Sequence, residues 1–283
     1  MYSFLKHKNK KDNLNIAKPK TFIKYLLRTL VFGKYNIFFW FIIKIFYNFS
    51  SKLILKKFLQ SLYNDCKVIA GPFKGIRYVE PISAGSSLIP KLLGTYEAEI
   101  IPTINSLKKN KYYKIINIGA AEGYYAIGFS LIFPDTNIVA YEINKETKEL
   151  LDKMIKFNKK ESQITTSENL CYEDFNKISS ELRLLIFSDC EGYEHELFNN
   201  DIIKKFINSD LILEMHTNNF DKTTLEKNFE KSHYIERINS DKHMINISQY
   251  SDLIINLKDY INIYAENRSE YHYFIILRSK NHN

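Results

Sequence analysis

The chain has 283 residues, 45% of them hydrophobic and 25% charged, which suits one α/β domain with an appendage. Its three cysteines, Cys66, Cys171 and Cys190, form no CxxC pair, which argues against a disulfide framework and a structural zinc site and for a reducing compartment. The net charge of +8 is uneven: residues 1–60 hold 13 basic residues and one acidic residue (+12), and the remainder holds 27 basic and 31 acidic residues (−4). The main domain is therefore mildly acidic, which argues against a nucleic-acid partner.

The N-terminal part changes character at about residue 20. Residues 1–20 are polar and Lys-rich, which predicts a disordered basic tail. Residues 21–62 are apolar and aromatic, most densely at 35–43, which predicts a helical segment. The apolar run starts too late, and lacks the small-residue cleavage site, for a signal peptide.

Three interpretations of this segment stay open: a membrane-spanning helix, a helix on a membrane surface, and a packing element. Residues 30–49 have the length of a membrane-spanning helix, but four polar positions interrupt them: Lys34, Asn36, Lys44 and Asn48. Basic residues around an aromatic helix favour a helix lying on an anionic membrane surface through residues 21–60, which would place a cytoplasmic protein on the inner face of a membrane. The alternative is a helical subdomain that packs on the main domain or on a second subunit. The sequence does not decide the oligomeric state.

Residues 63–110 predict a β-hairpin and a helix that lead into the core. Residues 67–79 have the pattern strand, tight turn, strand, with Pro72 and Gly75 at the turn. A loop of small residues follows at 83–87, and the stretch from about residue 91 leads into a helix ending near residue 108.

Residues 111–283 alternate between strand and helix patterns, which predicts an α/β fold with a mostly parallel sheet and helices on both faces. The predicted strands are 114–118, 138–142, 164–166, 184–188, 210–214, 233–239 and 271–278. The predicted helices are 123–132, 145–158, 193–206, 222–231 and 251–264.

A glycine-bearing turn follows the strand at 114–118. Gly119 lets the chain turn sharply, and Gly123 permits close approach of the backbone to a ligand at a helix N-terminus. Glu142 ends the next strand, where an acid can accept hydrogen bonds from both hydroxyls of an adenosine ribose. The turn lacks the G-x-G-x-x-G of dinucleotide sites, and Glu122 would face a pyrophosphate unfavourably but tolerate a cationic sulfonium. The pattern therefore favours S-adenosylmethionine over NAD.

Two further strands end in polar clusters. The strand at 184–188 is followed by Asp189, Glu191 and Glu194, and the strand from residue 210 ends with Glu214 and His216. Because ligands bind at the carboxyl edge of open α/β sheets, we expect these side chains to lie together at that edge. The simpler interpretation, an acid favoured at a helix N-terminus, also fits Glu194.

These strings together resemble the FkbM-like branch of class I S-adenosylmethionine-dependent methyltransferases. The resemblance rests on residues 117–123, 141–142, 189–194 and 214–216, with residues 94–97 as a further match, and it covers about residues 67–277. It implies a Rossmann-like class I methyltransferase fold with a seven-stranded sheet. The chain departs from the family at Asn117, where an acid is common, and at Ala121, which replaces a common glycine.

We expect the protein to methylate a hydroxyl of a sugar, a glycan or another small acceptor. An in-line transfer to a hydroxyl needs a base, for which we select His216 or Glu191, with Asp189 as a third catalytic residue. A variant of this hypothesis uses Mg²⁺ held by Asp189 and Glu214. The alternative to an enzyme is a non-catalytic binding or scaffold protein with the same fold. We assign to the acceptor Tyr96, Glu97 and Tyr124, and to the cofactor Asn117, Gly119, Ala121, Glu122, Gly123, Glu142, Cys171 and Asp189.

Overall fold

The computed structural model describes residues 60–168, 170, 180–216, 222–239 and 272–282. The chain divides into two compact units, one made of residues 1–61 and 246–265 and the other of residues 62–245 and 266–283. All elements named below belong to the second unit.

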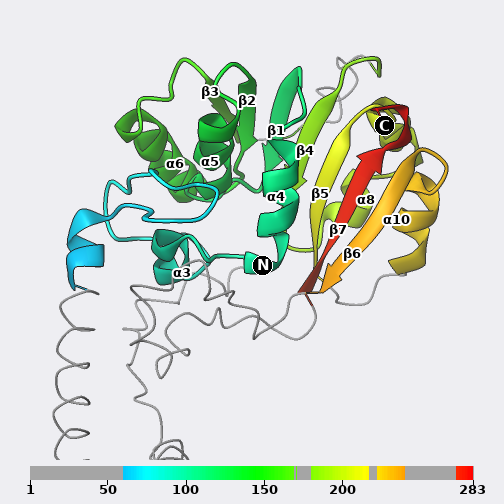
Figure 1. Cartoon of the computed structure of the whole chain (residues 1–283). Coiled ribbons are helices and arrows are strands. Elements are labelled where there is room, and N and C mark those ends of the chain that lie inside the picture. Colours follow the sequence, from blue (N-terminus) through cyan, green and yellow to red (C-terminus); the bar gives the residue numbers. More distant parts are fainter. Residues whose placement is uncertain (1–59, 169, 171–179, 217–221, 240–271, 283) are drawn as a thin grey trace, which may run out of the picture. The chain divides into compact units, whose positions relative to one another are not determined.

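A seven-stranded sheet with the order β3-β2-β1-β4-β5-β7-β6 forms the centre of this unit (Figure 1). Strands β1 to β5 pair in parallel, and β7 runs antiparallel between β5 and β6. This sheet confirms the predicted Rossmann-like class I methyltransferase fold. The strands are β1 (Lys114–Ile118), β2 (Asn137–Tyr141), β3 (Ile164–Ser167), β4 (Leu184–Ser188), β5 (Asp210–His216), β6 (His233–Asn239) and β7 (His272–Ser279).

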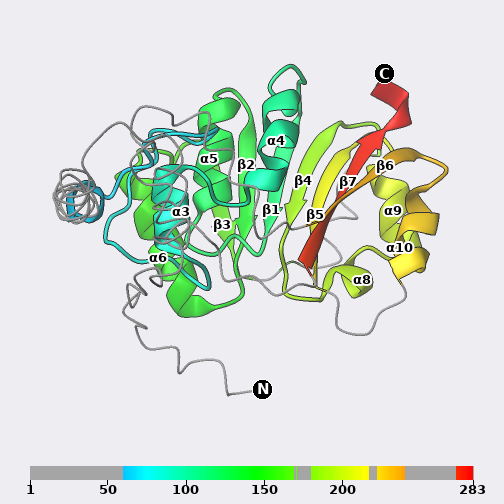
Figure 2. The same cartoon turned by 60° about the horizontal axis from the view of Figure 1, so that its bottom comes forward.

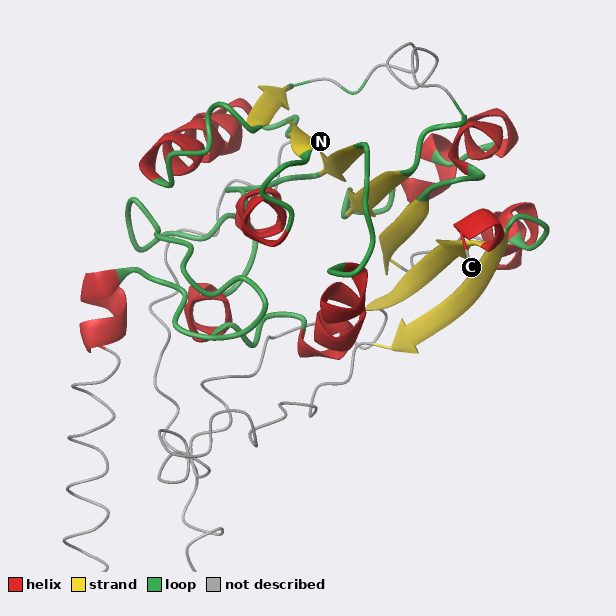
Figure 3. Ribbon diagram, turned by 45° about the horizontal axis from the view of Figure 1, so that its top comes forward, coloured by secondary structure: helices red, strands yellow, loops and turns green. Residues whose placement is uncertain are grey.

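Helices lie on both sides of the sheet, as predicted (Figure 3). On one side, Phe187 of β4 stacks on Tyr125 of α5, with ring centroids 3.8 Å apart. On the other side, Ile116 and Ile186 belong to an apolar core with the segments after β4. The helices are α3 (Leu88–Leu93), η2 (Ala98–Ile100), α4 (Ile101–Leu107), α5 (Tyr124–Ile132), α6 (Lys145–Phe157), α8 (Glu194–Leu197), α9 (Asn200–Ile203), η3 (Lys204–Phe206), α10 (Lys222–Phe229) and η6 (Lys280–His282).

The predicted helix 193–206 is wrong as one element, because it forms three short helices, α8, α9 and η3. Phe198 leaves the helical region with φ −97° and ψ 57°. The side chain of Asn199 then accepts a hydrogen bond from the N–H of Ile202, which is the arrangement of an N-cap that begins a new helix. The stretch from residue 91 leads, as predicted, into a helix that ends near residue 108: η2 continues directly into α4, which ends at Leu107. The preceding α3 ends at Gly94, which adopts a left-handed conformation.

The predicted hairpin at 67–79 is reduced to one isolated antiparallel bridge between Lys67 and Arg77. Its apolar residues serve packing instead of a regular ladder. Phe73 is fully buried against α5, where a Cβ added to Gly128 would stand 2.4 Å from the Phe73 ring. The segment therefore packs on one face of α5, ahead of the first strand of the sheet.

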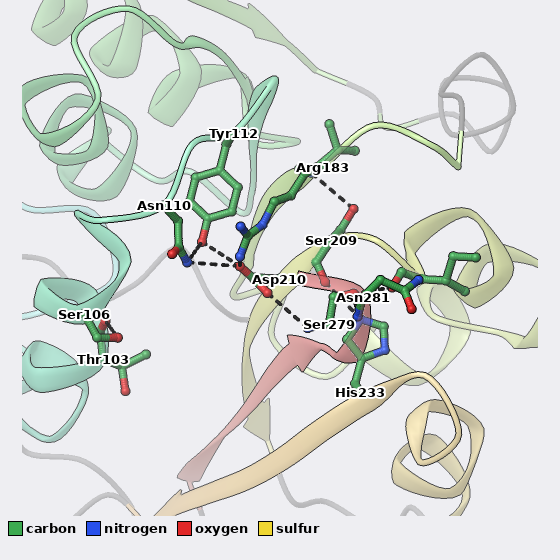
Figure 4. Close-up of polar contacts among 12 residues, drawn as sticks. Thr103, Ser106, Asn110, Tyr112, Arg183, Ser209, Asp210, His233, Ser279 and Asn281 are labelled. Carbon is green, nitrogen blue, oxygen red and sulfur yellow. Dashed lines mark hydrogen bonds and ion pairs between the residues drawn. The ribbon is translucent and has the colours of Figure 1, made fainter. Parts of the chain in front are cut away.

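A buried polar network closes the amino edge of the sheet (Figure 4). Asp210, the first residue of β5, accepts hydrogen bonds from the hydroxyl of Tyr112, the guanidinium of Arg183 and the N–H of Ser279, at 2.7, 2.7 and 3.1 Å. The Ser279 contact ties the end of β7 to the start of β5. Ligand chemistry is thereby left to the opposite, carboxyl edge.

The predicted basic tail, the helical segment at 21–62 and the helix at 251–264 fall outside the described residues, apart from residues 60–62, which are helical. Their roles stay predictions. Within the described part of the chain, every helix is too short or too polar to cross a membrane.

Candidate functional site

The carboxyl ends of the five parallel strands share the edge that is turned toward the viewer in Figure 2. At this edge the turn after β1 meets the turn after β4. Gly119 has φ +70°, and a Cβ there would stand 1.7 Å from the backbone oxygen of Asp189. Only glycine fits, so the close contact of these two turns depends on Gly119.

The acid after β2 is fixed over the glycine turn. Oε2 of Glu142 accepts a hydrogen bond from the N–H of Ala121 and Oε1 accepts one from the N–H of Asn144, both at 2.8 Å. Glu142 is only 8% exposed. The structure thus brings together the glycine turn and the strand-end acid, which stand 21 residues apart at this hydrogen bond.

Gly123, which the sequence assigned to the cofactor, also takes part in helix packing. It precedes α5 with φ +97°, and a Cβ there would stand 2.6 Å from Cδ1 of Leu151 in α6. Glycine at this position therefore allows the left-handed turn and the packing of α6 on α5.

Asn117 is fully buried in β1, two residues before Gly119. Neither Oδ1 nor Nδ2 of its side chain has a hydrogen-bond partner among the described residues. A buried amide without partners costs roughly 1–3 kcal/mol, so such a group in a folded protein calls for a ligand or a water molecule.

Glu122 is held from the segment that precedes the core. Its carboxylate lies 2.6 Å from Nζ of Lys91 and accepts hydrogen bonds from the hydroxyls of Tyr78 and Ser83 and from the N–H of Ala84, each at 3.1 Å. The positive charge of Lys91 balances the negative charge of Glu122. The argument that Glu122 would repel a pyrophosphate therefore no longer holds. The missing G-x-G-x-x-G pattern remains. Sequence reasoning missed Lys91; its one signal was a lysine within the apolar stretch of α3.

The residues assigned to the acceptor lie in or beside an aromatic cluster. Tyr124 is 3% exposed and packs edge-to-face on Phe73 and Tyr96, with centroids 5.1 and 5.6 Å apart. Glu97 is fully buried and accepts a hydrogen bond from the hydroxyl of Tyr125. Of the three assigned residues, Tyr96 alone is more than marginally exposed. Cys171, assigned to the cofactor, lies outside the described residues.

The three residues predicted to be catalytic converge at the ends of β4 and β5. Nε2 of His216 lies 3.6 Å from Oδ1 of Asp189 and 3.5 Å from Oε2 of Glu191. The side chain of Glu191 is 83% exposed, and that of His216 is 12% exposed. An imidazole and two carboxylates therefore face one another at the ligand edge, with Glu191 toward solvent.

Burial and mutual charge shift the pKa values in this cluster. Burial raises the pKa of Asp189 to about 7, and the nearby carboxylates of Glu97 and Glu191 act in the same direction, against His216 and a hydrogen bond with Glu214. Burial alone would lower the pKa of His216, but its carboxylate neighbours outweigh burial and raise it. The cluster consequently holds protons to a higher pH than the isolated groups would.

Glu194 lies on the other side of the His216 ring, with Oε1 3.6 Å from Nδ1. It is 1% exposed and accepts a 3.0 Å hydrogen bond from the N–H of Cys190. Burial would raise the pKa of Glu194, but the contacts with His216 and Cys190 lower it below its ordinary value. The Glu194 carboxylate thus binds the N–H of Cys190 in the turn and faces the His216 ring. These contacts go beyond the role at a helix N-terminus that the sequence also allowed.

His272 is a site residue that sequence reasoning missed. It begins β7 directly opposite His216 in the antiparallel register, and the two rings lie 4.6 Å apart. Its Nδ1 lies 3.6 Å from Oε1 of the buried Glu214. His272 could have been placed at this edge if the sequence showed that the last strand runs antiparallel beside β5. The local sequence pattern does not show which strands are neighbours. Among the residues that the structure describes, two groups of three side chains have ligand atoms close enough for a metal ion: Glu214, His216 and His272, and Asp189, Glu191 and His216.

No protein-family model and no curated protein match this chain. Among solved structures, it resembles precorrin-6Y C5,15-methyltransferase from Geobacter metallireducens GS-15, with 17% identity over 65% of this chain and 87% of that chain and a TM-score of 0.40. The C-terminal domain of the Rhodobacter capsulatus precorrin-6Y C5,15-methyltransferase matches with 8% identity over 64% and 87% of the two chains and a TM-score of 0.42. A SAM-dependent methyltransferase from Agrobacterium tumefaciens matches with 9% identity over 64% and 62% and a TM-score of 0.44. Such distant likenesses concern the fold, and only the residues of the site bear on function.

Proposed function

We propose that this protein is an S-adenosylmethionine-dependent methyltransferase that methylates a hydroxyl of a sugar, a glycan or another small acceptor. The observation that carries the proposal is the hydrogen bond from the N–H of Ala121 to Glu142, because it holds an acid at the end of β2 against the turn after β1. In open α/β sheets that corner receives the adenosine part of a cofactor.

The residues at this corner fit the cofactor. A carboxylate has about four lone-pair positions, and Glu142 uses one on each oxygen for a backbone N–H, which leaves acceptors for the two hydroxyls of a ribose. The unpartnered amide of Asn117 supplies a buried donor and acceptor on the strand that leads into the turn. Asn117, Ala121 and Glu142 would therefore hold the nucleoside.

When bound, S-adenosylmethionine supplies a methyl group activated by a cationic sulfonium. The chain has to hold the acceptor oxygen in line with that group and to remove the hydroxyl proton. Glu191 and His216 lie 3.5 Å apart at the ligand edge and are the two groups that can accept this proton. Asp189, beside them, balances the charge of His216.

Isothermal titration of the full chain with S-adenosylmethionine, its demethylated product and NAD tests the proposal. We expect heat with the first two ligands and none with NAD. Absence of heat with S-adenosylmethionine would favour the non-catalytic binding or scaffold protein. Mass spectrometry of glycans and lipids from cells with and without the gene then identifies the acceptor, as a mass difference of one methyl group.

A further inference from the structure

The structure assigns a binding site for a divalent transition-metal ion to the edge where β5 and β7 meet, with Glu214, His216 and His272 as its ligands. Their ligand atoms lie within 4.8 Å of one another. The strand pairing fixes two of them, because His216 ends β5 and His272 begins β7 in direct register. The inference depends on the proposed function only for what the ion does there.

The spacing of the polar atoms matches ligands of a common ion. Within the proposed site, Nδ1 of His272 lies 3.6 Å from Oε1 of Glu214. Beside the site, Nε2 of His216 lies 3.6 and 3.5 Å from the carboxylates of Asp189 and Glu191. An N–H···O hydrogen bond would bring the atoms to about 2.7–3.2 Å. Two ligands that each lie about 2.0–2.2 Å from a tetrahedral ion are roughly 3.3–3.6 Å apart. The separation of His272 and Glu214 therefore matches two ligands of one ion, and the ligand atom of His216 lies within 4.8 Å of both.

The surroundings of His216 match those of a metal ligand. A metal-bound histidine typically directs its other ring nitrogen to a carboxylate or a carbonyl, which fixes the ring and its tautomer. Here Nδ1 faces the buried Glu194, and Nε2 faces Asp189 and Glu191. Glu194 is itself held by the N–H of Cys190. Whichever ring nitrogen of His216 binds the ion, the other therefore faces a carboxylate.

Charge and unmet hydrogen bonding also favour a cation. Asp189, Glu191 and Glu214 bring three carboxylates to two imidazoles, and Glu214 is only 3% exposed. Within the described ranges, Oδ1 of Asp189 is a buried atom without a hydrogen-bond partner. Buried polar atoms without partners are expected where a water molecule or an ion belongs.

The ligand set selects the kind of ion. Two imidazoles and a carboxylate suit Zn²⁺, Mn²⁺ or Co²⁺, whereas Mg²⁺ prefers oxygen ligands and keeps most of its water. This set differs from the Mg²⁺ on Asp189 and Glu214 that the sequence suggested, because the sequence does not show that His272 lies beside them. An ion here would lower the pKa of an acceptor hydroxyl, with Glu191 as the remaining base.

Metal titration of the full-length protein tests the assignment without any methyl donor. The protein, freed of metal with a chelator, is titrated with Zn²⁺ against a chromophoric competitor and with Co²⁺ followed by visible absorption. We expect one ion to bind per protein chain and Co²⁺ to give absorption bands typical of mixed nitrogen and oxygen ligands. Equimolar Mg²⁺ should not compete. H272Q should weaken Zn²⁺ binding at least about tenfold, and H282Q, the same change at an exposed C-terminal histidine, should leave it unaltered.

E214Q is the second variant. Because the Glu214 side chain is buried, circular dichroism is used to check that this variant folds. His272 is one-quarter exposed, so H272Q disturbs the fold less. Zn²⁺ affinity that is the same in wild type and H272Q would overturn the assignment, as would a protein that binds no Zn²⁺ or Co²⁺. Such a result leaves the methyltransferase proposal intact, since cofactor binding is measured separately. Conversely, metal binding without S-adenosylmethionine binding would refute only the proposed function.

Discussion

The N–H of Ala121 and the carboxylate of Glu142 are joined by a 2.8 Å hydrogen bond, although they belong to the turn after β1 and the end of β2. The bond orients the carboxylate before any ligand arrives. A preoriented acceptor loses little conformational entropy on binding, so Glu142 should contribute strongly to cofactor affinity.

Glu142→Ala should weaken S-adenosylmethionine binding by roughly 1.5–3 kcal/mol, the range for hydrogen bonds to a charged acceptor. Isothermal titration gives the affinity. Glu146→Ala, at the start of α6, is the matched control and should change it little. Unchanged affinity in a folded Glu142→Ala protein would remove Glu142 from the ribose site.

Asp189→Asn and His216→Ala should each reduce methyl transfer by about 10²–10⁴-fold while cofactor affinity stays within a few-fold of wild type. Both side chains lie at the carboxyl ends of β4 and β5, and neither belongs to the glycine turn. The measurement is incorporation of a labelled methyl group into cell extract, beside titration of the cofactor. Near-normal turnover in both variants would show that the reaction takes place elsewhere.

Asp210→Ala should lower the free energy of unfolding by about 3 kcal/mol, because it leaves Arg183 and Tyr112 without their buried acceptor. We take the lower end of the usual range since the Arg183 side chain is 21% exposed. Asp152→Ala, which removes an exposed pair with Lys148, should cost less than about 1 kcal/mol. Urea denaturation compares the two, and equal losses would contradict a special role for Asp210.

His233 should make a contribution to stability that is lost as the pH is lowered through about 6.5. Burial lowers the pKa of this histidine, against the opposing effects of the Ser209 carbonyl and Asp210, and Lys280 lowers it further. The unfolded chain therefore binds the proton more readily, so this contribution is complete above pH 6.5 and is lost below it. On going from pH 7.5 to 5.5, the change in the urea midpoint should be more favourable to the folded state in His233→Gln than in wild type. Parallel profiles would exclude His233 as a source.

The first sixty residues should bind anionic membranes, because they combine a net charge of +12 with the apolar run at 35–43. Each basic residue near such a surface contributes about 1 kcal/mol, and the apolar part is insensitive to salt. The full chain should pellet with anionic vesicles, less so at high salt, and a chain starting at Lys67 should stay in the supernatant. A full chain that ignores the vesicles supports a packing element, and resistance to alkaline carbonate supports a span.

The sequence alone determined most strands of the sheet and the corner that holds the glycine turn. Strand β4 occupies the predicted residues 184–188, and α5 and α6 differ from prediction by one residue at one end. These features depend on the alternation of apolar residues and on glycine, which act over a few neighbouring positions. The meeting of Asp189, Glu191 and His216 also followed, because parallel strands end at one edge.

Only the tertiary structure decided which distant residues serve that edge. His272 reaches His216 because β7 lies antiparallel beside β5, and Lys91 reaches Glu122 because α3 packs against the glycine turn. The division of the predicted helix 193–206 likewise depends on the cap supplied by Asn199. Periodicity records which face of an element is buried but not which neighbour covers it, and contacts between remote residues depend on strand order and register.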